Sequence, residues 1–86
     1  MSSEERVGVV TGYYARIGVA AVRLSGGALH VGDYVRFRGH TTDFTQAVES
    51  LEVEHTPVQQ AEPGAEVALK VSERVRRHDG VFRVVV

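Results

Sequence analysis

The chain has 86 residues, of which 43% are hydrophobic, and its formal net charge at pH 7 is −1. This length predicts one domain with a modest core, and a charge so close to zero gives no overall attraction to nucleic acid or to acidic membranes. The absence of cysteine excludes a disulfide framework, a thiolate metal site and a cysteine nucleophile.

The N-terminal residues, MSSEER, are polar and acidic, and no long apolar stretch follows them. We therefore expect residues 1–5 to form a flexible N-terminus and residues 6–86 to form a single domain. We also expect neither a signal peptide nor a membrane span, and hence a cytoplasmic protein.

Short valine-rich runs separated by glycine and proline fill the rest of the chain without helical periodicity, and this pattern predicts an all-β fold. The six predicted strands span residues 6–15, 17–25, 34–38, 45–55, 66–71 and 81–86. Gly8 and Gly12 predict bulges or bends in the first strand. An uneven apolar spacing predicts a bulge near Glu49–Ser50 in the fourth strand. Pro63 and Gly64 predict a tight turn before the fifth strand, with φ above zero at the glycine.

Six short strands leave few ways to cover the sheet edges, and closure into a small antiparallel six-stranded β-barrel is the simplest of them. The adjacent residues Tyr13 and Tyr14 point to opposite faces of their strand, so we expect one in the core and one at the surface. The apolar strand positions predict a core made of Val9, Val22, Leu24, Val35, Phe37, Val48, Leu51, Val53, Val67, Leu69, Val71 and Val84.

The charges are unevenly distributed along the chain. Residues 43–66 hold six acidic residues and no basic one, whereas residues 67–86 hold five basic residues and two acidic ones. The loop between the last two predicted strands is basic through Arg74, Arg76 and Arg77. One face of the third predicted strand carries Tyr34, Arg36 and Arg38.

Arginine and tyrosine together suit the gripping of phosphates and the stacking of bases, so both groups are candidates for RNA contact. A charged protein-binding surface is an equal alternative. A third interpretation is a solvated surface that only balances the acidic segment.

A polar turn joins the third and fourth predicted strands through His40, Thr41, Thr42 and Asp43. An aspartate that orients a histidine beside a hydroxyl is the arrangement of a small hydrolase. The same side chains equally suit a binding tip, or bonds to local backbone amides that shape the turn. The sequence shows no second carboxylate and no oxyanion loop here, so we expect a polar connection available for binding and no enzymatic activity. The four histidines lack metal-ligand spacing, so we expect no metal and no cofactor.

Two stretches carry a resemblance to a known family. Residues 28–35, ALHVGDYV, resemble the turn written L-x-V-G-D-x-V in the second domain of translation factors, and residues 61–69, AEPGAEVAL, resemble that domain's A-x-x-G-x-x-V-x-L. The stretches Val7–Val10 and Ser50–Glu52 fall in the same order, so the resemblance covers about residues 6–85. The chain thus resembles the β-barrel domain that follows the GTPase domain in elongation factor Tu, and the small stand-alone translation elongation factor-like proteins. A similar barrel is appended to some collagenase-like peptidases that act in RNA modification.

Some functional residues of that family have no match in this chain. No G-x-x-x-x-G-K-[ST] stretch is present, so we expect no nucleotide to be bound by this chain alone. In elongation factor Tu the second domain helps to hold the aminoacyl end of tRNA, and the resemblance places its glutamate at Glu52. The arginine and the asparagine of that site correspond here to His55 and Glu66. Because the surrounding segment is acidic and repels phosphate, we do not expect the tRNA-end role to carry over.

These observations lead to one functional hypothesis and two alternatives. The leading hypothesis is a non-catalytic binding module that associates with RNA or a ribonucleoprotein in translation or RNA modification. The first alternative is a protein-interaction module, an accessory subunit that docks on a larger enzyme. The second and more distant alternative is a small hydrolase built on the turn from His40 to Asp43.

Overall fold

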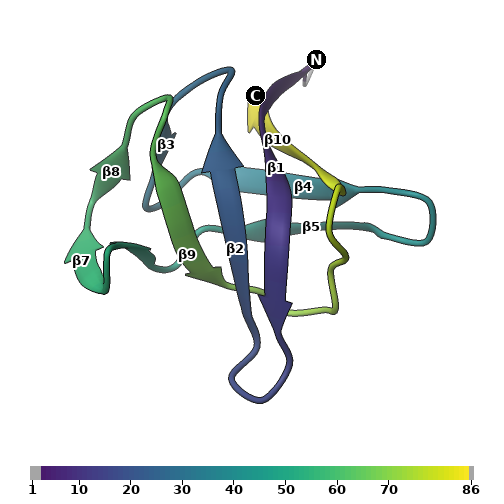
Figure 1. Ribbon diagram of the computed structural model, residues 1–86. Coiled ribbons are helices and arrows are strands. Elements are labelled where there is room, and N and C mark those ends of the chain that lie inside the picture. The colour runs from purple at the N-terminus through teal and green to yellow at the C-terminus, as the bar shows by residue number, and fades with distance from the viewer. Residues whose placement is uncertain (1–2, 86) are drawn as a thin grey trace.

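The computed structural model describes residues 3–85, which form an all-β, barrel-type fold, as predicted (Figure 1). Its strands are β1 (Ser3–Tyr14), β2 (Val19–Leu24), β3 (Leu29–His30), β4 (Tyr34–Arg38), β5 (Asp43–Ala47), β6 (Leu51–Val53), β7 (Thr56–Val58), β8 (Gln60–Ala61), β9 (Glu66–Lys70) and β10 (Gly80–Val85). Residues 3–85 form ten strands and not the six that were predicted. The sequence patterns did not reveal the short strands β3, β7 and β8, and the predicted fourth strand is divided into β5 and β6. Within the described part of the chain, no helix is long and apolar enough to cross a membrane.

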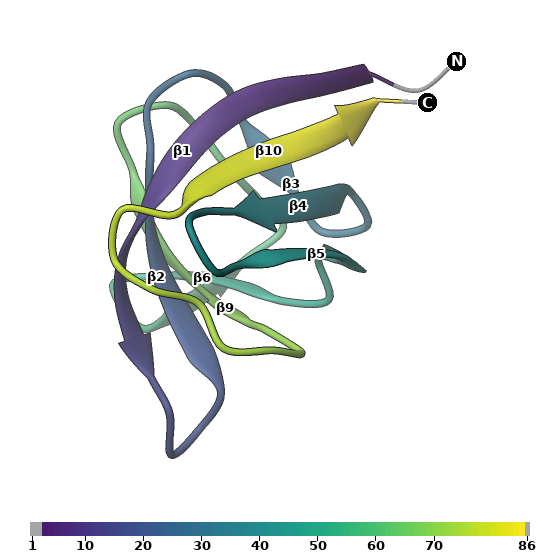
Figure 2. The same ribbon diagram turned by 90° about the vertical axis from the view of Figure 1, so that its right-hand side faces the viewer.

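Eight strands form one antiparallel sheet in the order β5-β4-β10-β1-β2-β9-β6-β7, and β3 pairs with β8 in a second, two-stranded sheet. The first and last strands therefore lie side by side in the middle of the main sheet, where they bend together around the core (Figure 2). Ser3 pairs with Val85, so residues 3–5, which we expected in a flexible N-terminus, belong to β1. Residues 1, 2 and 86 lie outside the described residues.

The main sheet does not close into a ring by backbone hydrogen bonds, and a side chain bridges β5 to β9 instead. The Gln46 amide nitrogen donates to the Lys70 carbonyl oxygen at 2.7 Å, and the Gln46 amide oxygen accepts from the Ser72 backbone N–H at 2.7 Å. A primary amide offers the same donor and acceptor as a peptide group. Gln46 thus takes the place of a backbone pairing at the open seam of the barrel.

Two bulges in β1 determine which of its residues enter the core. The pairing with β10 shifts between Arg6 and Gly8, and the pairing with β2 shifts between Val10 and Gly12, which confirms the predicted irregularities at both glycines. Each bulge inserts one residue and reverses the inward and outward alternation. The prediction of Val9 as a core residue was therefore wrong.

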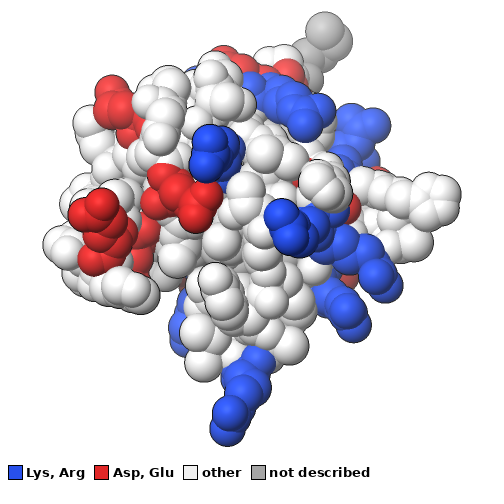
Figure 3. Space-filling model, in the orientation of Figure 1, with Lys and Arg blue, Asp and Glu red and all other residues white. Residues whose placement is uncertain are grey.

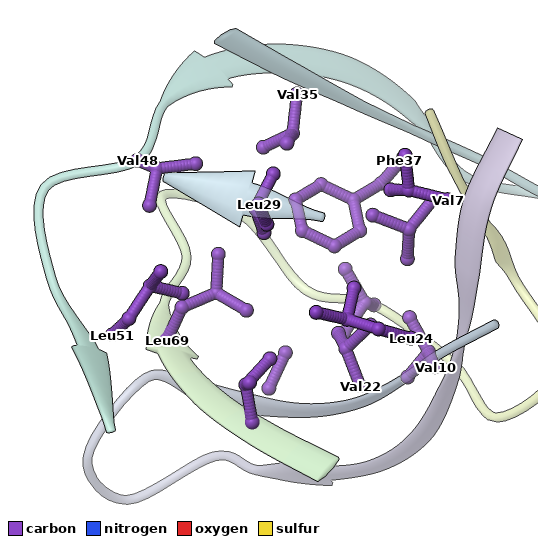
Figure 4. Packing of buried hydrophobic residues seen from close by; sticks show 14 of the residues in the cluster. Val7, Val10, Val22, Leu24, Leu29, Val35, Phe37, Val48, Leu51 and Leu69 are labelled. Carbon is purple, nitrogen blue, oxygen red and sulfur yellow. The ribbon is translucent and has the colours of Figure 1, made fainter. Parts of the chain in front are cut away.

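Sixteen buried hydrophobic residues fill the barrel. They come from every strand of the main sheet except β7, from both strands of the small sheet, and from two connecting segments, which supply Val48 and Val75. The side chains labelled in Figure 4 point toward one another. Two of them, Phe37 and Phe44, stack with ring centroids 5.1 Å apart. The prediction was correct for Val22, Leu24, Val35, Phe37, Val48, Leu51, Val67 and Leu69. Val53 and Val71 only border the core. Val84 lies on the outer face of the barrel, where it is paired with Tyr34 of β4. The prediction missed Val7, Val10, Ala20, Leu29, Phe44, Ala61, Val75 and Val81.

The predicted bulge near Glu49–Ser50 is a full break between β5 and β6. At this break the backbone N–H of Val48 donates to the Asp33 carbonyl at 2.8 Å, and the N–H of Gly32 donates to the Val48 carbonyl at 2.9 Å. The segment is therefore paired with a turn rather than with a strand. The predicted turn at Pro63–Gly64 is present, with φ of 99° at Gly64.

Candidate functional site

Two of the four residues of the polar turn at residues 40–43 have structural partners, Thr42 through its backbone and Asp43 through its side chain. Thr42 is buried, and its carbonyl accepts a hydrogen bond from Gly39 N–H at 2.8 Å, which closes the β4–β5 hairpin. Both Asp43 oxygens accept from Arg36, at 2.7 Å from Nε and 2.8 Å from Nη2. His40 and Thr41 are exposed, and no hydrogen bond joins His40 to Asp43 among the described residues. The Asp43 carboxylate is thus held by an arginine, and the structure does not bring the histidine and the aspartate together as a pair.

The face that carries Arg36 and Arg38 is paired with carboxylates from other strands. Glu4 of β1 accepts from Arg36 Nη1 at 2.7 Å and lies 3.5 Å from Arg38 Nη1. Arg38 also stacks over the Phe82 ring, with its guanidinium 5.5 Å from the ring centroid. The hydrogen bonds that Arg36 donates to Asp43, and then the one that it donates to Glu4, raise the pKa of Arg36, and the bonds that Asp43 accepts from Arg36 lower the pKa of Asp43.

This charge pairing changes the interpretation of the third predicted strand. Arg36 carries a full positive charge, but two carboxylates already neutralise it, so it is poorly suited to phosphate contact. Tyr34 remains on this face as an exposed aromatic side chain. The candidates on β4 therefore form a salt-bridged surface rather than a free basic one.

The loop between β9 and β10, by contrast, presents arginines without acidic partners. Arg74, Arg76 and Arg77 are exposed, and no carboxylate of residues 3–85 lies within 4 Å of their guanidinium groups. The loop is fixed at several points. Val75 is buried in the core, and the Arg76 N–H donates to the buried Asp79 carboxylate at 2.8 Å.

Further bonds fasten the same loop to β1. The Val10 N–H donates to the Asp79 carbonyl at 2.9 Å, and the His78 N–H donates to the Val10 carbonyl at 2.9 Å. Gly39 has no space for a side chain, because a Cβ atom there would collide with the Asp79 carboxylate. The loop is thus held by both β1 and the end of β4, and this limits the backbone freedom of its arginines.

The three arginines and two tyrosines line one shallow hollow of about 460 Å³, together with Thr11, Gly12 and Val75. Tyr13 packs partly against the core and Tyr14 is 58% exposed, which confirms the prediction that the two tyrosines face opposite ways. Cationic and aromatic side chains therefore share one concave surface. The sequence placed them about 60 residues apart, so only the pairing of β1 with the chain around Asp79 brings them together.

A second, larger hollow of about 690 Å³ lies on the outer face of β2, β9 and β6. Glu52, His55 and Glu66, the three positions that the resemblance singled out, all line it. Tyr14 lines both hollows and forms the wall between them. In Figure 3 most of the acidic side chains in view lie at the left, over β7, β8 and β9, and most of the basic ones lie at the right.

Sequence reasoning missed Ile17 and Glu54 of this second hollow. Ile17 had a detectable signal, because it is a large apolar residue beside Gly18 at the start of the second predicted strand. Glu54 had none, because nothing in the sequence indicates the backbone turn that places it. Among the described residues, no group of three histidine, aspartate or glutamate side chains is arranged to hold a metal ion.

The geometry of the barrel can be compared with known proteins. The family model for elongation factor Tu domain 2 matches residues 18–73, which is more than half of the chain. The chain belongs to the elongation factor Tu domain 2 family. The match includes the acidic residues of the hollow on β2, β9 and β6, but it ends just before the arginines of the β9–β10 loop and excludes all of β1.

Solved structures and curated relatives give a second comparison for this domain 2 barrel. The C-terminal domain of a Geobacillus thermoleovorans putative U32 peptidase superimposes with a TM-score of 0.85 and 28% identity, covering 92% of this chain and 91% of that domain. Two proteins named collagenase, from Porphyromonas gingivalis and its strain W83, are 36% identical over 72 residues, or 83% of this chain. The chain spans only 20% and 17% of their lengths. The barrel is therefore similar both to a translation-factor domain and to a terminal domain of larger proteins.

Proposed function

We propose that this domain 2 barrel is a non-catalytic binding module that associates with RNA through the hollow between the β9–β10 loop and β1. The observation that carries the proposal is that Arg74, Arg76 and Arg77 line one concave surface with the exposed Tyr14, beside the partly buried Tyr13. Unpaired guanidinium groups bind phosphates, and tyrosine rings stack on unpaired bases.

Several other arginines of the barrel are less available to a phosphate than the three arginines of the β9–β10 loop. Arg36 is neutralised by Glu4 and Asp43, and Arg23 and Arg83 each lie within 4 Å of a glutamate. A phosphate at those arginines would have to compete with a carboxylate that is already in place. The arginine loop has no such competitor among residues 3–85.

The test is a titration of a fluorescently labelled, unstructured single-stranded RNA of mixed sequence, followed by anisotropy. Three phosphate contacts on a single strand predict that the association constant falls about 20-fold when monovalent salt rises fourfold. The triple variant Arg74→Ala/Arg76→Ala/Arg77→Ala should lose most of the affinity and most of this salt dependence. The double variant Arg23→Ala/Arg83→Ala is the control, because it removes two ion-paired arginines outside the hollow. Binding that survives both high salt and the triple variant would refute the proposal.

A second candidate function is docking on a larger protein. It is favoured by the relatives, in which a segment similar to this chain makes up about a fifth of a much longer sequence. We propose on this ground that the barrel can also serve as an accessory module of an enzyme. Recovery of the tagged protein from lysate, with and without nuclease, tests it: a stoichiometric protein partner that persists after nuclease treatment supports docking, and recovery that depends wholly on RNA contradicts it.

A further inference from the structure

The hollow on the outer face of β2, β9 and β6, called here the outer groove, has a floor of small side chains. Ala21 of β2 pairs with Ala68 of β9, and Ala68 pairs with Glu52 of β6. Residues paired directly across antiparallel strands point to the same face, so these three form one row across the sheet. Two of the three are alanines, and the row is therefore a trough that ends at a carboxylate.

The walls of the outer groove are apolar at one end. Val19 and Lys70 form the neighbouring row on one side of the trough, and Tyr14 and Ile17 rise from the β1–β2 hairpin beside them. Tyr14 is 58% exposed and Ile17 is 64% exposed, so two large apolar side chains stand in solvent at the same place. The hairpin that carries them projects beyond the barrel at the bottom of Figures 1 and 2.

The opposite end of the outer groove is acidic and only partly neutralised. Glu66 lies 3.8 Å from Arg23, but no cationic group of residues 3–85 lies within 4 Å of Glu52 or Glu54. Lys70 is the single basic residue that lines the groove. A phosphate-bearing ligand is repelled by this end, whereas a guanidinium or an ammonium group is attracted to it.

We propose that the outer groove binds an extended segment of a protein partner that carries an arginine or a lysine two residues from a large apolar residue, so that both side chains point to the same face. The apolar side chain of the partner packs against Tyr14 and Ile17, and its cationic side chain reaches Glu52 and Glu54. The floor row crosses three strands, or roughly 10 Å at strand spacing, which matches about three residues of extended chain. The small floor residues leave room for the aliphatic stem of the cationic side chain.

This inference deepens the docking proposal by naming the face and the chemistry of the partner, and it is independent of RNA association. The arginine loop and the outer groove share only the Tyr14 wall. RNA and a cationic peptide segment therefore occupy different hollows of opposite charge. Failure of the RNA titration leaves the groove proposal unaffected.

The experiment is an NMR titration of the isotope-labelled protein with two blocked peptides. The probe is acetyl-Leu-Ala-Arg-Ala-amide, and the control replaces its arginine by citrulline, which keeps the shape and removes the charge. We expect saturable shift changes at the amides of Tyr14, Ala21, Glu52 and Ala68, and an affinity up to about fivefold weaker for the citrulline peptide. Equal affinity for the two peptides, no saturable change, or changes centred on the arginine loop would each overturn the proposal.

Variants separate a groove effect from a general charge effect. Glu52→Gln/Glu54→Gln should reduce affinity for the arginine peptide to that of the citrulline peptide. Glu49→Gln removes a negative charge from an exposed residue outside the groove, and should leave the affinity unchanged. If the nuclease-resistant partner binds the Glu52→Gln/Glu54→Gln protein as well as it binds the original, docking stands and the groove inference fails.

Discussion

At the scale of single residues, the least expected feature is the left-handed backbone of three residues that are not glycine. Glu54, His55 and His78 have φ values of 50°, 64° and 77°. Each such residue costs on the order of 1 kcal/mol relative to a conformation that suits a side chain. Glu54 and His55 line the outer groove, and His78 is the third residue of the turn that begins with Arg76 and Arg77. Both proposed binding surfaces thus border a residue that glycine would replace with less strain.

Replacement of His78 by glycine tests this interpretation. The Asp79 N–H donates to the Arg76 carbonyl at 3.1 Å, which closes a turn with His78 at its third position, where φ above zero is required. His78→Gly should therefore stabilise the protein by about 0.5–1 kcal/mol, or raise its melting temperature by roughly 2–8 °C. His78→Ala is the matched control, since it removes the same side chain but keeps the strain. A melting temperature raised equally by alanine would show that the imidazole, and not the backbone, is unfavourable.

At the scale of elements, an ion-pair network joins three strands on one face. Arg36 of β4 contacts Glu4 of β1 and Asp43 of β5, and Arg38 lies near the same glutamate. An ion pair forms only when the carboxyl group is ionised, so the network requires Glu4 and Asp43 to carry their negative charges. It should therefore make the stability of the β4–β5 hairpin sensitive to acid.

The direction of this acid dependence follows from the pKa of Asp43. Arg36 holds the pKa of Asp43 in the folded protein below its ordinary value of 3.8, so the pair stabilises the fold above that value. This stabilisation is lost as pH falls through the folded-state pKa. In thermal melts we expect the deficit of Asp43→Asn to be largest near neutral pH and to vanish at the acid end. Glu49→Gln, at an exposed carboxylate without an ion pair among residues 3–85, should show no such trend; a constant Asp43→Asn deficit would argue against the pair.

The open seam of the barrel gives a second prediction for the elements. Gln46 joins β5 to β9 through one donated and one accepted hydrogen bond. In Gln46→Glu, a carboxylate cannot donate to the Lys70 carbonyl and is repelled by it, which should destabilise the fold by about 1 kcal/mol or more at neutral pH. Protonation of the new carboxyl restores a donor, so the deficit should shrink below about pH 4. Gln46→Ala lacks this rescue; equal pH profiles for the two variants would refute the bridging role.

At the scale of the whole molecule, sequence patterns predicted where the longer strands lie but not which strands are neighbours in the sheet. The alternation in Tyr34–Arg38 predicted β4 with the correct bounds, and the Pro63–Gly64 turn was predicted from residue types alone. The two-residue strands β3 and β8 are too short to show any period, and each exists only because the other lies opposite. The ion pairs of Arg36 likewise depend on which strands are adjacent, so the basic face predicted on β4 could not be recognised as neutralised.

The dependence of contacts on which strands are adjacent also explains which parts of the candidate sites could be predicted. The arginine loop was recognisable as a cluster within a few residues, but its tyrosine partners come from the far end of the chain. Glu52, His55 and Glu66 were singled out by resemblance rather than by periodicity, and the barrel does gather them. Their apolar neighbour Ile17 and the small floor residues were missed, because a row of alanines on one face of a sheet is a property of strand register.

The sheet order leads to a final prediction about folding. The matched family segment, residues 18–73, contains neither β10 nor β1, which lie between β4 and β2 in the sheet. Without them the main sheet separates into a hairpin of β4 and β5 and a group formed by β2, β9, β6 and β7. We therefore expect a fragment of residues 18–73 to be unfolded, with poorly dispersed amide resonances and no cooperative melt.

A circular permutant is the complementary test, because it keeps every strand. Ser3 pairs with Val85, so a short glycine-serine linker can join the two ends without crossing the sheet. New ends between Arg16 and Ile17 open only the exposed turn of the β1–β2 hairpin, where both residues face solvent. The permutant should melt cooperatively and give dispersed amide resonances, since all eight strands of the main sheet retain their neighbours. A folded 18–73 fragment, or an unfolded permutant, would show that β1 and β10 do not join the two halves of the barrel in the way that the sheet order indicates.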